Sequence, residues 1–257
     1  EKGLTVTINA SISDLSFKMA TPVSIVARQI LQYASNIAEA IEVAARYDIF
    51  VSELFLIGSA SDNKAIIIEK RPGVQCIFNP PGNSILSTNH FQSSCFAYES
   101  NSIQQRINTA SGPRFQRLRK LIDEANPFTP ASIVAILRDT KGLTDNDIGL
   151  GNEQSLHQFI GHHSIVFSPT ELRFWISTTP YQSGEFVAYD LEKLFNEQSE
   201  NSFETSYLID SLNIPADTLS IQQDVSRIQH YRVLKRNLRS DNFTFEQFDT
   251  LILNNPW

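Results

Sequence analysis

The chain has 257 residues, of which 41% are hydrophobic and 19% charged, and its formal net charge is −7. This length suits one sizeable domain or two small ones, and the composition is that of an ordinary globular protein. An acidic chain without a cluster of basic residues argues against nucleic-acid binding, and no apolar run reaches the roughly 18 residues of a membrane span.

The cysteines and histidines of the sequence give little indication of a disulfide scaffold or a metal site. The two cysteines, Cys76 and Cys95, are too few for a disulfide scaffold, and the sequence leaves open whether they pair or stay reduced. The histidines include the adjacent His162 and His163, but no HExxH or CxxC spacing appears. We therefore expect no metal site.

The chain opens with a predicted strand and a pair of helices. Residues 4–9, LTVTIN, alternate apolar and polar side chains and are rich in β-branched residues, which is typical of a half-buried strand. Thr21 and Pro22 suit the N-cap and first position of a helix, because proline lacks only an N–H that is not needed there. Apolar residues at helical spacing follow, with a break at Ser35 and Asn36.

Strand patterns come next. The stretches FVSELFLIGSA and KAIIIEKRP predict two strands joined by a polar turn at residues 59–63. Weaker strands are expected at residues 75–78 and 84–88. Strands that follow a helix pair in this way indicate a sheet with helices on one side.

The middle of the chain is predicted to be helical. Helices are expected at about residues 103–109, 113–126 and 130–139, the last of them capped by Thr129. Three short strands then follow in HSIVFSP, ELRFWIST and GEFVAYDL. Strands that occur in groups favour layered α+β packing over a doubly wound parallel sheet.

Less regular patterns remain near the end of the chain. His162 and His163 open a strand, where one ring is expected to face the core and the other the solvent. Apolar residues from Ile221 to Leu238 (Val225, Ile228 and Leu234 between them) share one face of a predicted helix, and residues 245–253 predict another.

Polar side chains at the ends of predicted elements are the candidates for chemistry. Asn9 ends the first strand, Asn89 ends a later one, and Arg114 opens a helix in SGPRFQRL. A side-chain amide held at a strand end can donate to the negative oxygen that develops when a carbonyl is attacked. Asparagine also ends strands for structural reasons, so these residues alone leave both interpretations open.

Other catalytic arrangements have less support. The serine motif GxSxG and the phosphate-binding motif GxxxxGK[ST] are absent. Cys95 with His90 or His163 is an alternative nucleophile and base, although a cysteine in such a loop more often only packs.

Six stretches in order along the chain carry a family resemblance: EKGL, TINA, IIIEK, ILSTNHF, SGPRFQRL and HHSIVFSPTELRFWIST. Over about residues 1–190 the chain resembles the N-terminal-nucleophile (Ntn) amidases of the choloylglycine (bile salt) hydrolase, penicillin V acylase and penicillin acyltransferase group, closest to the acyltransferase-like branch. The resemblance implies a four-layer αββα sandwich of two antiparallel sheets, with residues 1–257 forming a single Ntn-hydrolase-like domain.

The resemblance also implies a mechanism. In that family, autoprocessing turns a cysteine into the N-terminus, its α-amine serves as base, and its thiolate attacks an amide carbonyl. Asn9 and Asn89 then correspond to the oxyanion donors, and Arg114 to an arginine that favours the thiolate. Phe91 and Phe115, with Phe96 beside them, are expected to line an acyl pocket, although phenylalanines at such positions more often belong to the core. No metal or organic cofactor is implied.

The chain departs from the family at its first residue, which is glutamate. We therefore expect the cysteine, with the arginine and aspartate that follow it, upstream of Glu1, so that the N-terminal strands are missing. The expected function is hydrolysis or acyl transfer at linear amides through a Cys thioester. The alternative is a catalytically inactive homologue that binds a small acyl ligand. The expected partner is a small-molecule amide or acyl-CoA substrate, with no nucleic acid and no membrane span, and a homo-oligomer is left open.

Overall fold

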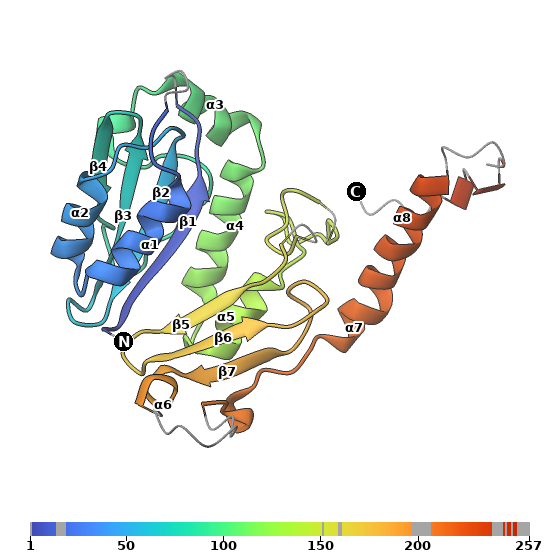
Figure 1. Cartoon of the computed structure of the whole chain (residues 1–257). Helices are drawn as coiled ribbons and strands as arrows, with labels where there is room; N and C mark the ends of the chain where they lie inside the picture. Colours follow the sequence, from blue (N-terminus) through green and yellow to red (C-terminus); the bar gives the residue numbers. More distant parts are fainter. Residues whose placement is uncertain are drawn as a thin grey trace. The chain divides into compact units, whose positions relative to one another are not determined.

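The computed structural model describes residues 2–13, 19–150, 152–158, 161–196, 207–237, 244, 246–247 and 249–250. The chain divides into two compact units. The first comprises Glu1–Lys120, Phe167–Phe174 and Asp190–Tyr207, and the second comprises Leu121–Val166, Trp175–Tyr189 and Leu208–Trp257. Figure 1 follows the helices and strands of both units along the chain.

The first unit contains a four-stranded antiparallel sheet in which consecutive strands are neighbours (Figure 1). The strands are β1 (Leu4–Ala10), β2 (Glu53–Ser59), β3 (Lys64–Arg71) and β4 (Val74–Phe78). All four were predicted from the alternation and β-branched content of their residues, and β2 begins later than the apolar pattern suggested. Because side chains alternate along each strand, the sheet has two distinct faces.

One face is apolar and is covered by α1 (Val23–Tyr33) and α2 (Ile37–Ala45). Buried residues of both layers form the core: Val26, Ile30, Ala40, Ala44, Phe55, Ile57, Ile66 and Ile68. Each fully buried large aliphatic or aromatic side chain contributes about 1.5–3 kcal/mol. This face is therefore the main source of hydrophobic stability in the first unit.

The predicted break between the two helices is confirmed. Asn36 is the N-cap of α2, and its side-chain oxygen accepts the backbone N–H of Glu39 at 2.9 Å. The predicted cap at Thr21 is wrong, because α1 begins at Val23 with Pro22 in the N-cap position. Thr21 instead forms a parallel bridge to a residue after α2, which keeps its backbone extended.

The opposite face is covered by residues 83–96. Leu54 and Ile67 of the sheet pack there against Phe91 and Phe96. The disulfide between Cys76 of β4 and Cys95 links this segment to the sheet, with 6.5 Å between the two Cα atoms. The second face thus has a covering of loop rather than helix.

The strand predicted at residues 84–88 is wrong, since this segment joins no sheet. Ser87 finds a partner in the side chain of Asn9, at 2.9 Å, and not in a neighbouring strand. The prolines of the preceding NPPGN loop have no backbone N–H and so cannot donate a hydrogen bond to a neighbouring strand. The segment consequently leaves the sheet edge and crosses the face.

Two helices complete the surroundings of this face. Helices α3 (Ser100–Asn108) and α4 (Ser111–Glu124) both begin earlier than the patterns suggested, and a short 3₁₀ turn, Ser94–Phe96, precedes them. A β-carbon on Gly112 would lie 2.1 Å from the carbonyl oxygen of Arg106, so only glycine allows this approach of α4 to α3. Helix α4 begins in the first unit and ends in the second.

A three-stranded sheet of β5 (Ile165–Ser168), β6 (Arg173–Ser177) and β7 (Phe186–Asp190) lies mostly in the second unit. Helix α5 (Pro130–Leu137) packs on it, and the shared core is formed by Val134, Val166, Trp175, Phe186 and Ala188. The predicted cap of α5 is confirmed, because Thr129 accepts the N–H of Ser132 and a capping box is present.

One prediction at the start of β5 is wrong. His162 and His163 are both exposed, and neither ring faces the core. The strand begins at Ile165, and the buried residue before it is Ser164, whose N–H donates to the hydroxyl of Ser177 at 2.8 Å. The two histidines therefore lie in the irregular segment before the strand.

The predicted C-terminal helix is present as α7 (Thr218–Ser220), a π-helical turn Ile221–Val225, and α8 (Ser226–Asn237). Val225 and Ile228, which the apolar pattern placed on one face of the helix, are both buried and pack on Leu150. The side chain of Leu234, and Leu238 as a whole, lie outside the described residues. Of the helix predicted at 245–253, residues 246–247 and 249–250 are described, and they are helical.

Two short elements remain, α6 (Leu191–Asn196) and a 3₁₀ turn, Asp210–Leu212. The molecule is thus a mixed α+β structure with two antiparallel sheets and helices, as predicted. In the part of the chain that the structure describes, no helix is long and apolar enough to cross a membrane. The same residues include no group of acidic, histidine and cysteine side chains suited to a metal ion.

Candidate active site

The end of β1 is tied to residues 87–89 by two hydrogen bonds. Asn9 Nδ2 donates to Ser87 Oγ, and Asn89 Nδ2 donates to the carbonyl oxygen of Ala10, each at 2.9 Å. Asn9 lies opposite Leu54 in the sheet, and so shares the loop-covered face. Two asparagines that are far apart in the sequence therefore meet at one end of the sheet.

Arg114 joins the same cluster from the first turn of α4. Its Nη2 donates to Asn89 Oδ1 at 2.6 Å, and the backbone N–H of Asn89 donates to Ser111 Oγ at 2.9 Å. The guanidinium only donates, and the Ala10 carbonyl only accepts, so the orientation of the Asn89 amide is fixed without ambiguity. The structure thus brings together Asn9, Asn89 and Arg114.

The two amides keep donor capacity for a ligand. An asparagine amide nitrogen has two N–H groups, and the contacts of Asn9 and Asn89 within the protein use one on each side chain. Both residues are half-buried, so the remaining N–H groups are not sealed in the core. Amides held in this way are suited to donating hydrogen bonds to a negatively charged oxygen, because their N–H groups are already in place when the charge develops.

A buried polar group supports Asn89 from behind. His90 Nδ1 lies 2.8 Å from Ser111 Oγ and 3.2 Å from Thr88 Oγ1. Burial, with the positive charges of Arg106 and Arg114, lowers the pKa of His90 to about 4, so the ring is neutral at pH 7. Ser111 is only 1% exposed, which keeps a substrate away from its hydroxyl. This serine–histidine contact positions the backbone of Asn89 and is not a nucleophile and base.

Glu69 on β3 holds the next part of the loop. Its carboxylate accepts the N–H of Gln92 at 2.6 Å and both the N–H and the hydroxyl of Ser93, at 3.1 and 2.5 Å. The side chain is fully buried, and burial raises its pKa although these hydrogen bonds act in the opposite direction. Three donors to one buried carboxylate fix the segment that carries Asn89 against the sheet.

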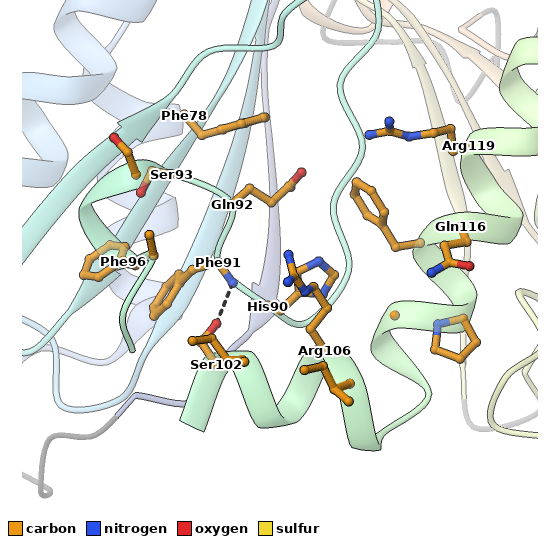
Figure 2. Close-up of a pocket in the computed structure, with 17 residues that line it drawn as sticks. Phe78, His90, Phe91, Gln92, Ser93, Phe96, Ser102, Arg106, Gln116 and Arg119 are labelled. Carbon is orange, nitrogen blue, oxygen red and sulfur yellow. Dashed lines mark hydrogen bonds between the residues drawn. The ribbon is translucent and has the colours of Figure 1, made fainter. Parts of the chain in front are cut away.

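Phe91 and Phe115 both line a cavity of about 1100 Å³. Phe91 is labelled in the close-up of the cavity (Figure 2). The ring of Phe91 is 7% exposed and stacks on Phe96 with 4.2 Å between centroids, so it is largely core. Phe115 is half-buried and meets His90 edge-on at 5.3 Å. His90 lines the cavity, whereas Asn89 does not, so the cavity lies next to the amide cluster.

The alternative cysteine nucleophile is not supported. Cys95 is bonded to Cys76, so it has no free thiol to pair with a histidine. Among the described residues, the amide cluster therefore contains oxyanion-type donors and a cation but no cysteine thiol.

A serine and a histidine also meet in the second unit. Ser183 Oγ lies 3.4 Å from His157 Nε2, and both residues are buried, at 0% and 1% exposure. Burial, with the charge of Arg138, lowers the pKa of His157 to about 4. Because a substrate cannot reach either group, we interpret this pair as part of the core.

Sequence reasoning missed the residues that hold the cluster in place. Ser87 and Ser111 are small polar residues with no motif around them, and only the fold shows what they contact. Glu69 did leave a signal, because a carboxylate directly after three isoleucines needs a buried partner.

Comparison with known proteins places the chain in a family. The family model described as acyl-coenzyme A:6-aminopenicillanic acid acyl-transferase matches residues 1–179, which include Asn9, Asn89 and Arg114. No curated protein matches the chain. The matched residues are most of the chain and contain the entire amide cluster, and the chain therefore belongs to the acyl-coenzyme A:6-aminopenicillanic acid acyl-transferase family.

Proposed function

We propose that the complete protein hydrolyses linear amides, or transfers their acyl groups, through a thioester on an N-terminal cysteine that is not part of residues 1–257. The observation that supports this most strongly is the amide cluster, in which Asn9 and Asn89 each hold one N–H in reserve and Arg114 contacts Asn89 directly. The family match supports acyl transfer as the reaction class.

The proposed reaction has two steps. The cysteine thiolate attacks the amide carbonyl, and the electron pair of the C=O bond moves to the oxygen, which accepts hydrogen bonds from Asn9 and Asn89. The carbonyl re-forms as the C–N bond breaks, and the amine leaves with a proton from the α-ammonium group of the cysteine. Water or a second amine then attacks the thioester and releases the thiol.

Arg114 is proposed to act on the nucleophile. A guanidinium close to a thiol lowers the pKa of the thiol, because it stabilises the thiolate. The hydrogen bond to Asn89 would hold that charge beside the oxyanion donors. Phe91 and Phe115 are proposed to contact the acyl group from the adjoining cavity.

We also propose that both units belong to one four-layer αββα domain that spans residues 1–257. The two antiparallel sheets, and the helices on the outer face of the first, are compatible with this arrangement. An experimental structure of the complete protein would test it, and two sheets that do not pack face to face would contradict it.

The function is tested by trapping the acyl-enzyme. The complete protein is incubated with phenylacetyl-coenzyme A, and its mass is measured before and after addition of 6-aminopenicillanic acid. We expect one phenylacetyl group on the N-terminal cysteine, followed by loss of that group to the amine or to water. Peptide mapping of the acylated protein locates the phenylacetyl group and shows whether Cys76 or Cys95 carries any of it. A protein that binds the thioester without being acylated, and that also releases no amine from N-phenylacetyl amides, would identify the non-catalytic alternative.

A further inference from the structure

The cavity beside the amide cluster has an unusual charge for an acidic protein. It lies between the loop after β4, helix α3 and the first turns of α4, as Figure 2 shows. Two arginines line it, Arg106 from α3 and Arg119 from α4. None of its lining residues is acidic, although the chain carries a net charge of −7.

Both arginines are held at the cavity. The guanidinium of Arg119 lies over the ring of Phe115, at 5.2 Å from its centroid. Arg106 reaches from α3 toward His90 (Figure 2), and its charge is one of the causes that keep the His90 ring neutral. Both side chains are exposed, so a ligand from solvent can reach them.

Two other arginines of the described residues lie beside acids. Arg71 pairs with Glu99 at 2.8 Å, and Arg173 lies 3.7 Å from Glu171. Arg106 and Arg119 have no such pairing with an acidic residue of the described part of the chain. Two cations without acids around them attract a negative group, and a guanidinium matches carboxylate and phosphate geometry.

The remaining wall of the cavity combines neutral polar residues, such as Gln92 and Gln116, with apolar and aromatic ones. Phe78 and Phe115 are both half-exposed there, and Ile107 is largely exposed. A pocket with a few polar groups at one place and aromatic side chains elsewhere is typical of a site for a small organic molecule. Its volume of about 1100 Å³ has room for such a ligand.

We propose that this cavity binds an organic anion, with its carboxylate or phosphate held between Arg106 and Arg119 and its aryl or alkyl body against Phe78 and Phe115. This inference depends on the cavity itself and not on the amide chemistry. If the proposed function also holds, the substrate carries a negative charge away from its reacting amide.

The test is isothermal titration calorimetry of the complete protein with three probes. These are 4-phenylbutyrate, phenyl phosphate, and the uncharged alcohol 4-phenylbutan-1-ol. We expect at least one anion to bind about tenfold more tightly than the alcohol, since hydrogen bonds to charged groups are the stronger kind. The tighter of the two anions identifies the preferred head group.

Arginine variants locate the site. Arg106→Gln and Arg119→Gln are each expected to weaken anion binding about fivefold, a modest factor because both guanidiniums are exposed. Binding of the alcohol should change little. Arg28→Gln, an equivalent loss of charge at an exposed position on α1, is the matched control.

Salt provides a measurement that needs no variant. Anion binding by the wild type should weaken between about 50 and about 500 mM sodium chloride, whereas alcohol binding should not. Equal affinity for the alcohol and both anions, or no difference among the three arginine variants, would overturn the proposal. These binding results are separate from acylation of the cysteine, so failure of one proposal is distinguishable from failure of the other.

Discussion

The two faces of the first sheet are built differently. On one face, α1 and α2 close over a continuous apolar core. On the other, residues 83–96 donate hydrogen bonds to Glu69, accept one from Asn9, and are joined to β4 by the disulfide. The helix-covered face stabilises the unit by burying apolar side chains. On the loop-covered face, the hydrogen bonds of buried polar groups fix the position of Asn89. The candidate chemistry lies on the second face, where Asn9 and Asn89 are only half-buried.

Neighbouring residues on β3 allow the sharpest comparison of the two faces. Ile68 is buried under the helices and Glu69 under the loop. Ile68→Ala should lower the free energy of unfolding by about 2–5 kcal/mol and leave the turnover of folded protein unchanged. Glu69→Ala should cost about 3–5 kcal/mol, because it leaves buried donors unpaired, and should also lower turnover.

Urea denaturation gives the free energy of unfolding for both variants, and turnover is measured at a temperature where each is folded. If Ile68→Ala lost as much turnover as Glu69→Ala, the assignment of separate roles to the two faces would be wrong.

A pH effect is expected from the helix-covered face. Burial raises the pKa of Glu53 from 4.5 to about 7, and one of its oxygens has no hydrogen-bond partner. Glu53 ionises at a lower pH in the unfolded chain than in the folded one. The folded state is therefore not penalised by Glu53 below about pH 4.5, where the side chain is neutral in both states. The free energy of unfolding falls as the pH rises from about 4.5 through about 7, because ionisation of the buried Glu53 is unfavourable in the folded state.

Glu53→Gln should therefore stabilise the protein by up to about 3 kcal/mol at pH 8 and have little effect near pH 4.5. Denaturation of both proteins across this range measures the difference. Glu153→Gln, at an exposed position, controls for the loss of one charge. A stability difference that does not depend on pH would contradict burial as the cause of the raised pKa.

A smaller effect is expected from Arg114 on the loop-covered face. If it favours the thiolate, Arg114→Gln should raise the pKa that governs the acid limb of the kcat/KM profile by about one pH unit. At pH values on the acid limb, kcat/KM of the variant should be about tenfold lower than that of the wild type. An unchanged acid limb with a lower plateau would mean that Arg114 only positions Asn89.

Sequence patterns predicted the strands and helices well where the signal is local. Asn9 was identified at the end of a strand because the alternation of LTVTIN is contained in the segment itself. Residues 84–88 were predicted wrongly because their apolar residues look like a strand, and pairing with a neighbour is a property of the fold.

The same limit applies to the site. Asn89 and Arg114 were predicted through the family resemblance, and their direct contact appears only in the structure. The disulfide was left open, because the distance between Cys76 and Cys95 depends on how the loop crosses the sheet. The roles of Ser111 and Glu69 depend on burial and on partners distant in sequence, which a single sequence does not show.

The central claim is that the Asn89 amide stabilises the negative oxygen of an attacked amide or thioester. Its most direct test is kcat of the complete protein for Asn89→Ala, with Asn108→Ala at an exposed position of α3 as the matched control. We predict that Asn89→Ala lowers kcat by about 10²-fold or more, with little change in KM, as expected for one lost oxyanion donor. An Asn89→Ala variant that folds and turns over at the rate of the Asn108→Ala control would contradict the account.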